Sequence, residues 1–180
     1  MSTPLLRHRS IVRLALAVLG AALLLPVAAK QSDRQQQVFV TADHFDGMNA
    51  PNSVSHLRGH VVITQGTLKA SGNTADVYFD ADSGVSRVLL KGAPAHVQQM
   101  DDHGNLMTGS AATVDYQVAK DVAILTGNAQ VKQKNRGEAR GDKLVYNTRT
   151  SAMSGESGGD SRVHLIFQPK QPAASGSSGK

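Results

Sequence analysis

The sequence predicts an all-β protein. Apolar and polar residues alternate along many short segments, which is the pattern of a β-strand with one buried face. The clearest case places Val114, Tyr116 and Val118 on one face, between polar neighbours. Glycine, asparagine, aspartate and proline separate the segments, as they do at turns. No stretch beyond the N-terminal apolar run keeps a helical period, so we expect no helical domain.

Two modules recur along the chain at an interval of about 30–35 residues, which is typical of stacked supersecondary units. Each unit is a strand pair that buries its apolar face only by stacking on its neighbours. The first module ends in a glycine-containing turn, and the second combines small, polar and aromatic residues. The first covers residues 57–66, 90–99 and 125–133, and the second covers residues 41–45, 74–79, 112–116 and 141–146.

The ends of the chain differ in composition from its middle. Residues 1–29 have the basic start, the apolar run and the small-residue end of a cleaved secretory signal peptide. Residues 30–37 form a polar N-terminal segment, and residues 170–180 are rich in Pro, Ser and Gly, which predicts a disordered tail. The β domain is expected to span residues 38–169.

Composition excludes two classes of function. The formal net charge is +5, and removal of Arg7, Arg9 and Arg13 with the signal peptide leaves +2. A charge of +2 is too small to indicate a nucleic-acid-binding protein. The chain has no cysteine, so neither disulfides nor thiolate chemistry is available. Aromatic residues make up only 4%, so slim aliphatic side chains must fill the interior.

Turn residues divide the β domain into short strands. Long hairpin tips are expected at residues 46–52 and 101–105, where Asp, Gly and Asn cluster. The strands are predicted at residues 38–42, 57–66, 68–71, 74–79, 85–91, 95–100, 113–118, 122–126, 129–134, 143–147 and 163–167.

Few residues suggest chemistry. His56 and His60 are four apart, but a glycine intervenes and no third ligand follows, so we expect no metal site. Asp101, Asp102 and His103 could be drawn as acid and base, yet they belong to a turn without a nucleophile.

Two further segments carry weak signals. Residues 155–159 are glycine-rich but lack the lysine of a phosphate-binding loop, so we predict an ordinary loop. A basic stretch at the tip of a predicted hairpin contains Lys132, Lys134 and Arg136. These side chains are either solvated or in contact with anionic sugar or phosphate groups.

The pattern leaves two architectures open. Stacked sheets of aliphatic residues either pack into a filled sandwich core or leave an unsealed slot for a linear apolar ligand.

Several ordered motifs resemble the LptA, or OstA-like, family of periplasmic lipopolysaccharide transport proteins. The similarity runs from about Val38 to Pro169. The matching segments are residues 61–69, 99–104, 116–121, 125–129 and 141–146.

The resemblance implies a twisted, V-shaped β-jellyroll of about sixteen short antiparallel strands. It also implies a non-enzymatic periplasmic protein, without cofactor or metal, that shields the acyl chains of lipid A and carries lipopolysaccharide from the inner to the outer membrane. The implied partners are an LptC-like jellyroll anchored in the inner membrane, the N-terminal domain of an LptD-like outer-membrane barrel, and further copies of the chain stacked head to tail by β-strand pairing.

The lipid-contacting positions come partly from the resemblance and partly from strand alternation. The resemblance implies Val38, Val40, Val97, Tyr116 and Val118, where some relatives have an aromatic residue in place of Val97. Alternation adds Val61, Ile63, Val77 and Phe79.

Two other functions remain as alternatives. One is a structural assembly module of the envelope that pairs with partners but has no lipid-binding interior. The other is a hydrolase of envelope sugars, for which Asp101 and Asp102 would be the carboxylate pair.

Overall fold

The computed structural model describes Asp33 and residues 35–101 and 104–169. The expected signal peptide and the expected tail lie outside these residues. The described residues form ten strands and one short 3-10 helix, Val118–Lys120. The strands are β1 (Val38–Thr41), β2 (His44–Asp46), β3 (Val54–Gln65), β4 (Leu68–Phe79), β5 (Val85–Met100), β6 (Leu106–Gln117), β7 (Val122–Gln133), β8 (Gly137–Asn147), β9 (Met153–Glu156) and β10 (His164–Phe167).

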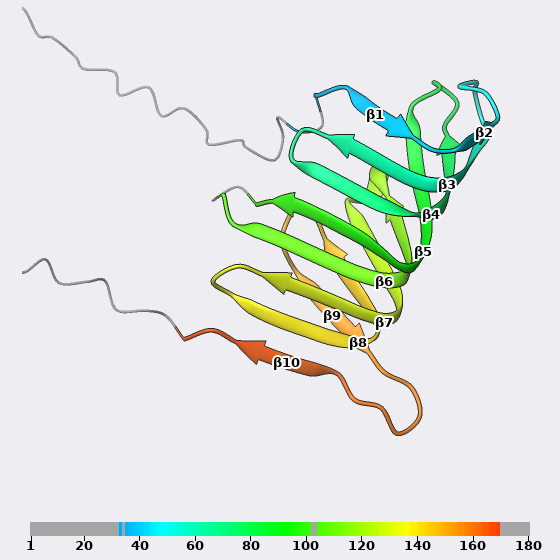
Figure 1. Ribbon diagram of the computed structural model, residues 1–180. Helices are drawn as coiled ribbons and strands as arrows, with labels where there is room; N and C mark the ends of the chain where they lie inside the picture. Colours follow the sequence, from blue (N-terminus) through cyan, green and yellow to red (C-terminus); the bar gives the residue numbers. More distant parts are fainter. Residues whose placement is uncertain (1–32, 34, 102–103, 170–180) are drawn as a thin grey trace, which may run out of the picture.

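All ten strands belong to one antiparallel sheet in the order β1-β3-β4-β5-β6-β7-β8-β10 (Figure 1). The short strands β2 and β9 lie off this path, because β2 pairs with β3 and β9 pairs with β8. Each end of the sheet therefore has two short strands, one against each half of a long strand. β1 pairs with residues 62–65 of β3 and β2 with residues 56–58.

The six long strands each cross a bend that divides the sheet into two arms. The first arm contains β1, β10 and residues 61–65, 68–72, 95–100, 106–111, 129–133 and 137–141. The second arm contains β2, β9 and residues 54–58, 74–79, 85–91, 113–117, 122–126 and 143–147.

Bulges make the bend. The strand register shifts between Arg58 and Val61, and again at the same level of the later strand pairs. Gly59 and Gly127 have φ values of 76° and 85° there, which glycine adopts without a steric penalty.

The expected breaks at Gly72, Gly92 and Gly127 therefore lie inside strands. Three pairs of predicted strands are each one bent strand in the structure. Residues 68–71 and 74–79 belong to β4, residues 85–91 and 95–100 to β5, and residues 122–126 and 129–133 to β7. If each of the six long strands is counted as two halves, the ten strands become the expected sixteen.

Two other local predictions are corrected. Gly155 and Glu156 were expected in a loop, but they belong to β9. They extend the second arm because Leu144 pairs with Gly155, where the absent side chain leaves room for the Leu144 side chain. Val118 was expected on a strand, but it begins the 3-10 turn that connects β6 to β7.

The core lies between the arms, next to the bend. In the second arm, Leu57, Ala75, Leu90, Val114, Leu125 and Leu144 form one row across the sheet, and all are buried. Facing them near the bend, the first arm has the small residues Gly72, Ala95, Ala111, Ala129 and Gly141. The small residues let the two arms approach each other there. Burial of each leucine side chain in this layer contributes about 1.5–3 kcal/mol to the stability of the fold.

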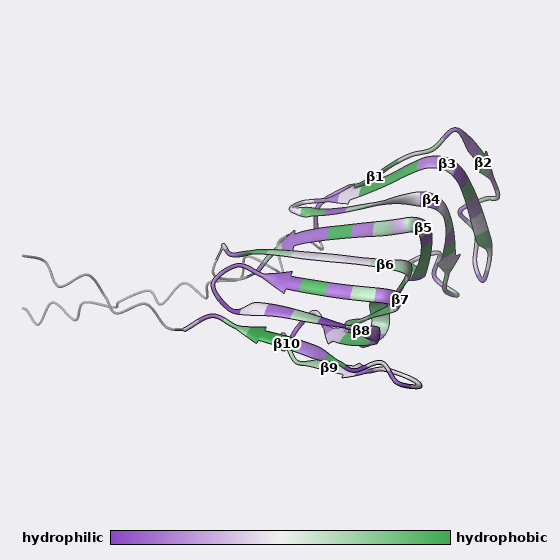
Figure 2. Cartoon of the chain, turned by 60° about the horizontal axis from the view of Figure 1, so that its bottom comes forward, coloured by the Kyte–Doolittle hydropathy of each residue, from purple (hydrophilic) through white to green (hydrophobic). Residues whose placement is uncertain are grey.

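The outer face of the sheet is polar. Figure 2 shows hydrophobic and hydrophilic residues alternating along β5 and β7, as expected for strands with one buried face. Arg87 binds Asp115 in a bidentate ion pair at 2.7 and 2.9 Å and lies over the ring of Tyr78. The hydrogen bond and charge of Asp115 raise the pKa of Arg87.

Candidate functional site

An apolar groove runs between the two arms and has a wide part and a narrow part. The wide part, of about 830 Å³, lies between β1, β2 and the 3-10 turn. The narrow part, of about 90 Å³, extends toward β7 and β8. The two parts share Ile63, Gln65, Leu68, Val88 and Tyr116, so they adjoin and form one groove.

The inner face of the first arm carries two rows of side chains, defined by the strand register, and the members of these rows from β1 to β7, except Gln133, line the groove. The middle row is apolar throughout, whereas the row at the hairpin tips, the rim row, alternates apolar residues with glutamine. The middle row is Val40, Ile63, Ala70, Val97, Gly109, Val131, Ala139 and Leu165. The rim row is Val38, Gln65, Leu68, Gln99, Met107, Gln133, Gly137 and Phe167.

The second arm faces these rows with a row that contains two tyrosines. In register order this row is Ser55, Val77, Val88, Tyr116, Ala123, Tyr146 and Met153. Tyr116 is partly exposed to the groove, whereas Tyr146 is only 2% exposed. The phenol groups of Tyr116 and Tyr146 are therefore polar groups at two positions along an otherwise mainly apolar lining.

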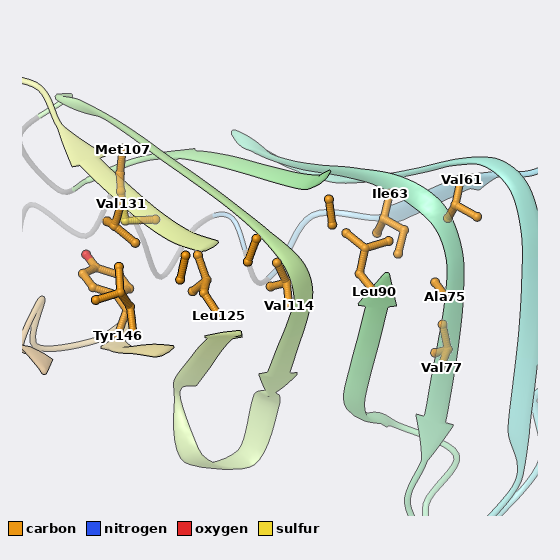
Figure 3. Close-up of a cluster of buried hydrophobic side chains, with 14 of the residues drawn as sticks. Val61, Ile63, Ala75, Val77, Leu90, Met107, Val114, Leu125, Val131 and Tyr146 are labelled. Carbon is orange, nitrogen blue, oxygen red and sulfur yellow. The ribbon is translucent and has the colours of Figure 1, made fainter. Parts of the chain in front are cut away.

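The groove narrows because the arms approach each other near β6 and β7. A Cβ atom on Gly109 of the first arm would lie 3.0 Å from Leu125 of the second. Tyr146 lines the same narrow part as Met107 and Val131 (Figure 3). Its hydroxyl accepts a hydrogen bond of 3.4 Å from Gln133 Nε2, which connects the arms.

Of the nine predicted lipid-contacting residues, eight line the groove. Val38, Val40, Ile63, Val77, Phe79, Tyr116 and Val118 line the wide part, and Val97 lines the narrow part. Val61 lies at the bend with 0% exposure and lines neither part. The bulge after Arg58 places Val61 in the packed layer below the groove.

The structure adds groove residues that sequence reasoning missed. Val88 and Leu68 line both parts, and Ala123 lines the narrow part. The alternation within residues 85–91 could have indicated Val88. The rim glutamines were missed because a polar residue on an alternating strand is ordinarily assigned to the solvent face.

The histidines and carboxylates form separate pairs on the outside of the molecule. His56 Nδ1 lies 2.7 Å from Asp76, and His60 Nδ1 lies 2.8 Å from Asp43. Among the described residues, no three His, Cys, Asp or Glu side chains come together as metal ligands. Asp101 accepts hydrogen bonds from Asn105 within the hairpin tip, and Asp102 and His103 lie outside the described residues.

Two carboxylates, Glu138 and Asp142, have lowered pKa values because neighbouring groups donate hydrogen bonds to them. A hydrogen bond from Arg140 lowers the pKa of Glu138, and backbone and hydroxyl donors from Gly158 and Ser161 lower that of Asp142. Lys132 lies on the outward side of β7, while Lys134 and Arg136 lie in the following turn.

Both ends of the sheet are open. In the part of the chain that the structure describes, β1, β2, β9 and β10 each pair on one side only. Val38, Phe39 and Val40 at one end are 42–64% exposed, and Leu165, Ile166 and Phe167 at the other are 53–78% exposed. An unpaired strand with apolar side chains is a template for another strand.

These features define the class of the protein: an all-β protein with a bent antiparallel sheet, an apolar groove between its two arms, and end strands that pair on one side only among the described residues. None of the described helices is long and apolar enough to cross a membrane.

Comparison with known proteins identifies the family. The family model described as LptA/(LptD N-terminal domain) LPS transport protein matches residues 39–152. The chain belongs to this family. It is 30% identical over 158 residues to the lipopolysaccharide export system protein LptA of Escherichia coli strain K12, which covers 86% of this chain and 84% of that protein.

A second relative has a solved structure. The lipopolysaccharide export system protein LptH of Pseudomonas aeruginosa is 30% identical over 165 residues, covering 87% of this chain and 91% of LptH. The crystal structure of LptH, the LptA homologous periplasmic component of the conserved lipopolysaccharide transport device from that organism, superposes with a TM-score of 0.68 at 28% identity. It covers 77% of this chain and 99% of the LptH chain.

Proposed function

We propose that this protein binds lipopolysaccharide in the groove between its arms and carries it across the periplasm. The observation that supports this most directly is the mainly apolar lining of a groove that is open to solvent at its wide part. A filled core would leave no such space. The relatives LptA and LptH are lipopolysaccharide export system proteins, which supports lipopolysaccharide as the transported molecule.

The groove suits acyl chains for a physical reason. Each buried methylene contributes about 0.8 kcal/mol, so even part of one acyl chain gains substantial free energy in the wide part. The sugars of lipid A then remain at the hairpin tips, in contact with water. The function is binding and transfer rather than catalysis, and energy for movement comes from a partner.

The open ends provide the route between neighbours. The middle row of the first arm begins at Val40 and ends at Leu165, and both are half exposed because the row stops there. Pairing of β10 with β1 of a second copy continues the row and the groove. The same edges suit an LptC-like partner at the inner membrane and an LptD-like partner at the outer membrane. Residues 1–29 direct the chain to the periplasm as a cleaved signal.

Site-specific photo-crosslinking in cells tests this function. A photoreactive residue in place of Tyr116, which faces the groove, is expected to capture lipopolysaccharide. The matched control replaces Thr113, which lies on the outer face of the same strand and avoids the Arg87–Asp115 ion pair. Equal labelling at both positions, or none at Tyr116, would count against lipid binding and favour a structural assembly module.

A further inference from the structure

Three glutamines occupy equivalent places in the rim row of the first arm. Gln65, Gln99 and Gln133 follow one another at intervals of 34 residues. Each lies at the end of a long strand, directly before or one residue before a hairpin tip of the first arm. In the rim row they alternate with Leu68 and Met107. We call these three residues the glutamine ledge.

The ledge lies between an apolar floor and water. The row below it is entirely apolar, and beyond it the chain turns into exposed hairpin tips. All three glutamine side chains are partly buried, and Gln65 and Gln99 line the groove. A partly buried amide loses hydration, so its place at this boundary requires polar partners.

Each ledge amide donates a hydrogen bond to an oxygen atom of the protein. Gln65 Nε2 donates to the main-chain carbonyl of Gln36 at 3.2 Å, and Gln99 Nε2 donates to the Asp33 carboxylate at 3.3 Å. Gln133 Nε2 donates to the Tyr146 hydroxyl at 3.4 Å. Residues 33 and 36 precede β1, so Gln65 and Gln99 already bind acceptor oxygens of a segment that is outside the sheet.

We infer that the glutamine ledge is a binding site for the neutral carbonyl groups that join acyl chains to the sugar of a glycolipid. A primary amide both donates and accepts, so it pairs with amide and ester links without a charge. The row below accepts the chains that begin at those links. The nearby Asp33 carboxylate disfavours an anionic phosphate at Gln99, which leaves neutral acceptors as the fitting chemistry.

This inference rests on the proposed function, and it adds what determines the depth to which acyl chains enter the groove. The glutamines fix how far the acyl chains enter, because the carbonyl links stop at the rim. The spacing along the rim follows the hairpins, so a glycolipid with several acyl links can bind more than one amide.

Replacement of the ledge by methionine tests the inference. The triple variant Gln65→Met, Gln99→Met and Gln133→Met keeps side-chain length and lets the groove remain apolar. Two probes are compared on purified full-length mature protein: lipid A, which has amide and ester links, and diphenylhexatriene, an apolar fluorophore with no acceptor. Lipid A affinity is expected to fall about tenfold or more, while diphenylhexatriene affinity stays within about twofold.

Gln98→Met is the matched control, because Gln98 is adjacent to Gln99 on the outer face. An unchanged lipid A affinity in the triple variant would overturn the inference, and so would an equal loss for both probes. The proposed function fails in a different way: wild-type protein would then bind diphenylhexatriene but not lipid A.

Discussion

Gln133 of the first arm and Tyr146 of the second arm connect the two walls of the groove through a hydrogen bond from Nε2 to the hydroxyl at 3.4 Å. Tyr146 is also among the largest fully buried side chains of the described residues. The same residue therefore fills space and bridges the arms, and its two roles can be separated by mutation.

We expect Tyr146→Ala to lower the free energy of unfolding by about 3–5 kcal/mol, because it leaves a cavity between the arms. Tyr146→Phe keeps the ring and loses only polar contacts, so the expected loss is about 0.5–1.5 kcal/mol. Urea denaturation of both variants measures the difference. Equal losses would show that the ring itself contributes little to packing.

Gly109→Val should obstruct the narrow part of the groove. Its added side chain points at Leu125, with a Cβ contact of 3.0 Å, and a β-branched residue suits a strand. We expect less lipopolysaccharide crosslinking at Val131, with crosslinking at Phe79 in the wide part retained.

The control for this variant is Ser110→Val, which places the same residue on the outer face of β6. Overpacking at Gly109 should also cost about 1–3 kcal/mol of stability, measured by thermal denaturation. Unchanged labelling at Val131 in a folded Gly109→Val protein would show that the narrow part is not on the lipid path.

Charges at the two ends of the middle row should control assembly. Val40→Asp and Leu165→Lys each place a charge in an apolar row, so each single variant should remain monomeric where wild-type protein forms oligomers. A mixture of the two variants should form dimers, because β10 of the Val40→Asp chain and β1 of the Leu165→Lys chain both keep their native residues. Analytical ultracentrifugation measures the species, and oligomers formed by either variant alone would contradict β10-to-β1 pairing.

Acid should weaken the hydrogen bonds that attach the loop between β9 and β10 to Asp142 of β8. Gly158 N–H and Ser161 O–H donate to Asp142 at 2.8 Å each, and they lower its pKa in the folded protein. The stability that this carboxylate adds is therefore complete above the ordinary aspartate pKa of about 3.9 and is lost as the pH falls through the lowered value.

We expect Asp142→Asn to flatten the fall of Tm below about pH 4 compared with wild-type protein. Asp160→Asn in the same loop is the control, since no described residue hydrogen-bonds to the Asp160 carboxylate. Identical Tm curves for wild type and Asp142→Asn would show that these hydrogen bonds do not contribute to stability.

Alternation predicted at least part of eight of the ten strands, but it missed β2, β9 and the first-arm halves of β6 and β8. It also could not distinguish a bend from a turn. Gly127 and Asn128 have positive φ values of 85° and 51°, as residues of a hairpin turn have, yet the strand continues through them. A bulge and a turn both require such residues, and only pairing with the adjacent strands decides between them.

The groove was predicted only in part for a related reason. Residues such as Ile63 and Val77 were recognisable because alternation marks a buried face. The role of Gln65 depends on its level along the strand, at the boundary between the apolar row and the tip. That level is set by the register of three hairpins, although the 34-residue interval from Gln65 to Gln99 was a usable signal.

Within residues 35–101 and 104–169 the sheet has no closing strand, and this gives the protein a fixed increment of length. Eight strands lie side by side along the main path of the sheet, and neighbouring strands are about 4.8 Å apart. One copy thus supplies about 38 Å of channel, and joining copies end to end lengthens it only in whole multiples of that distance. The span between two membranes would then be matched by counting molecules rather than by stretching any one of them.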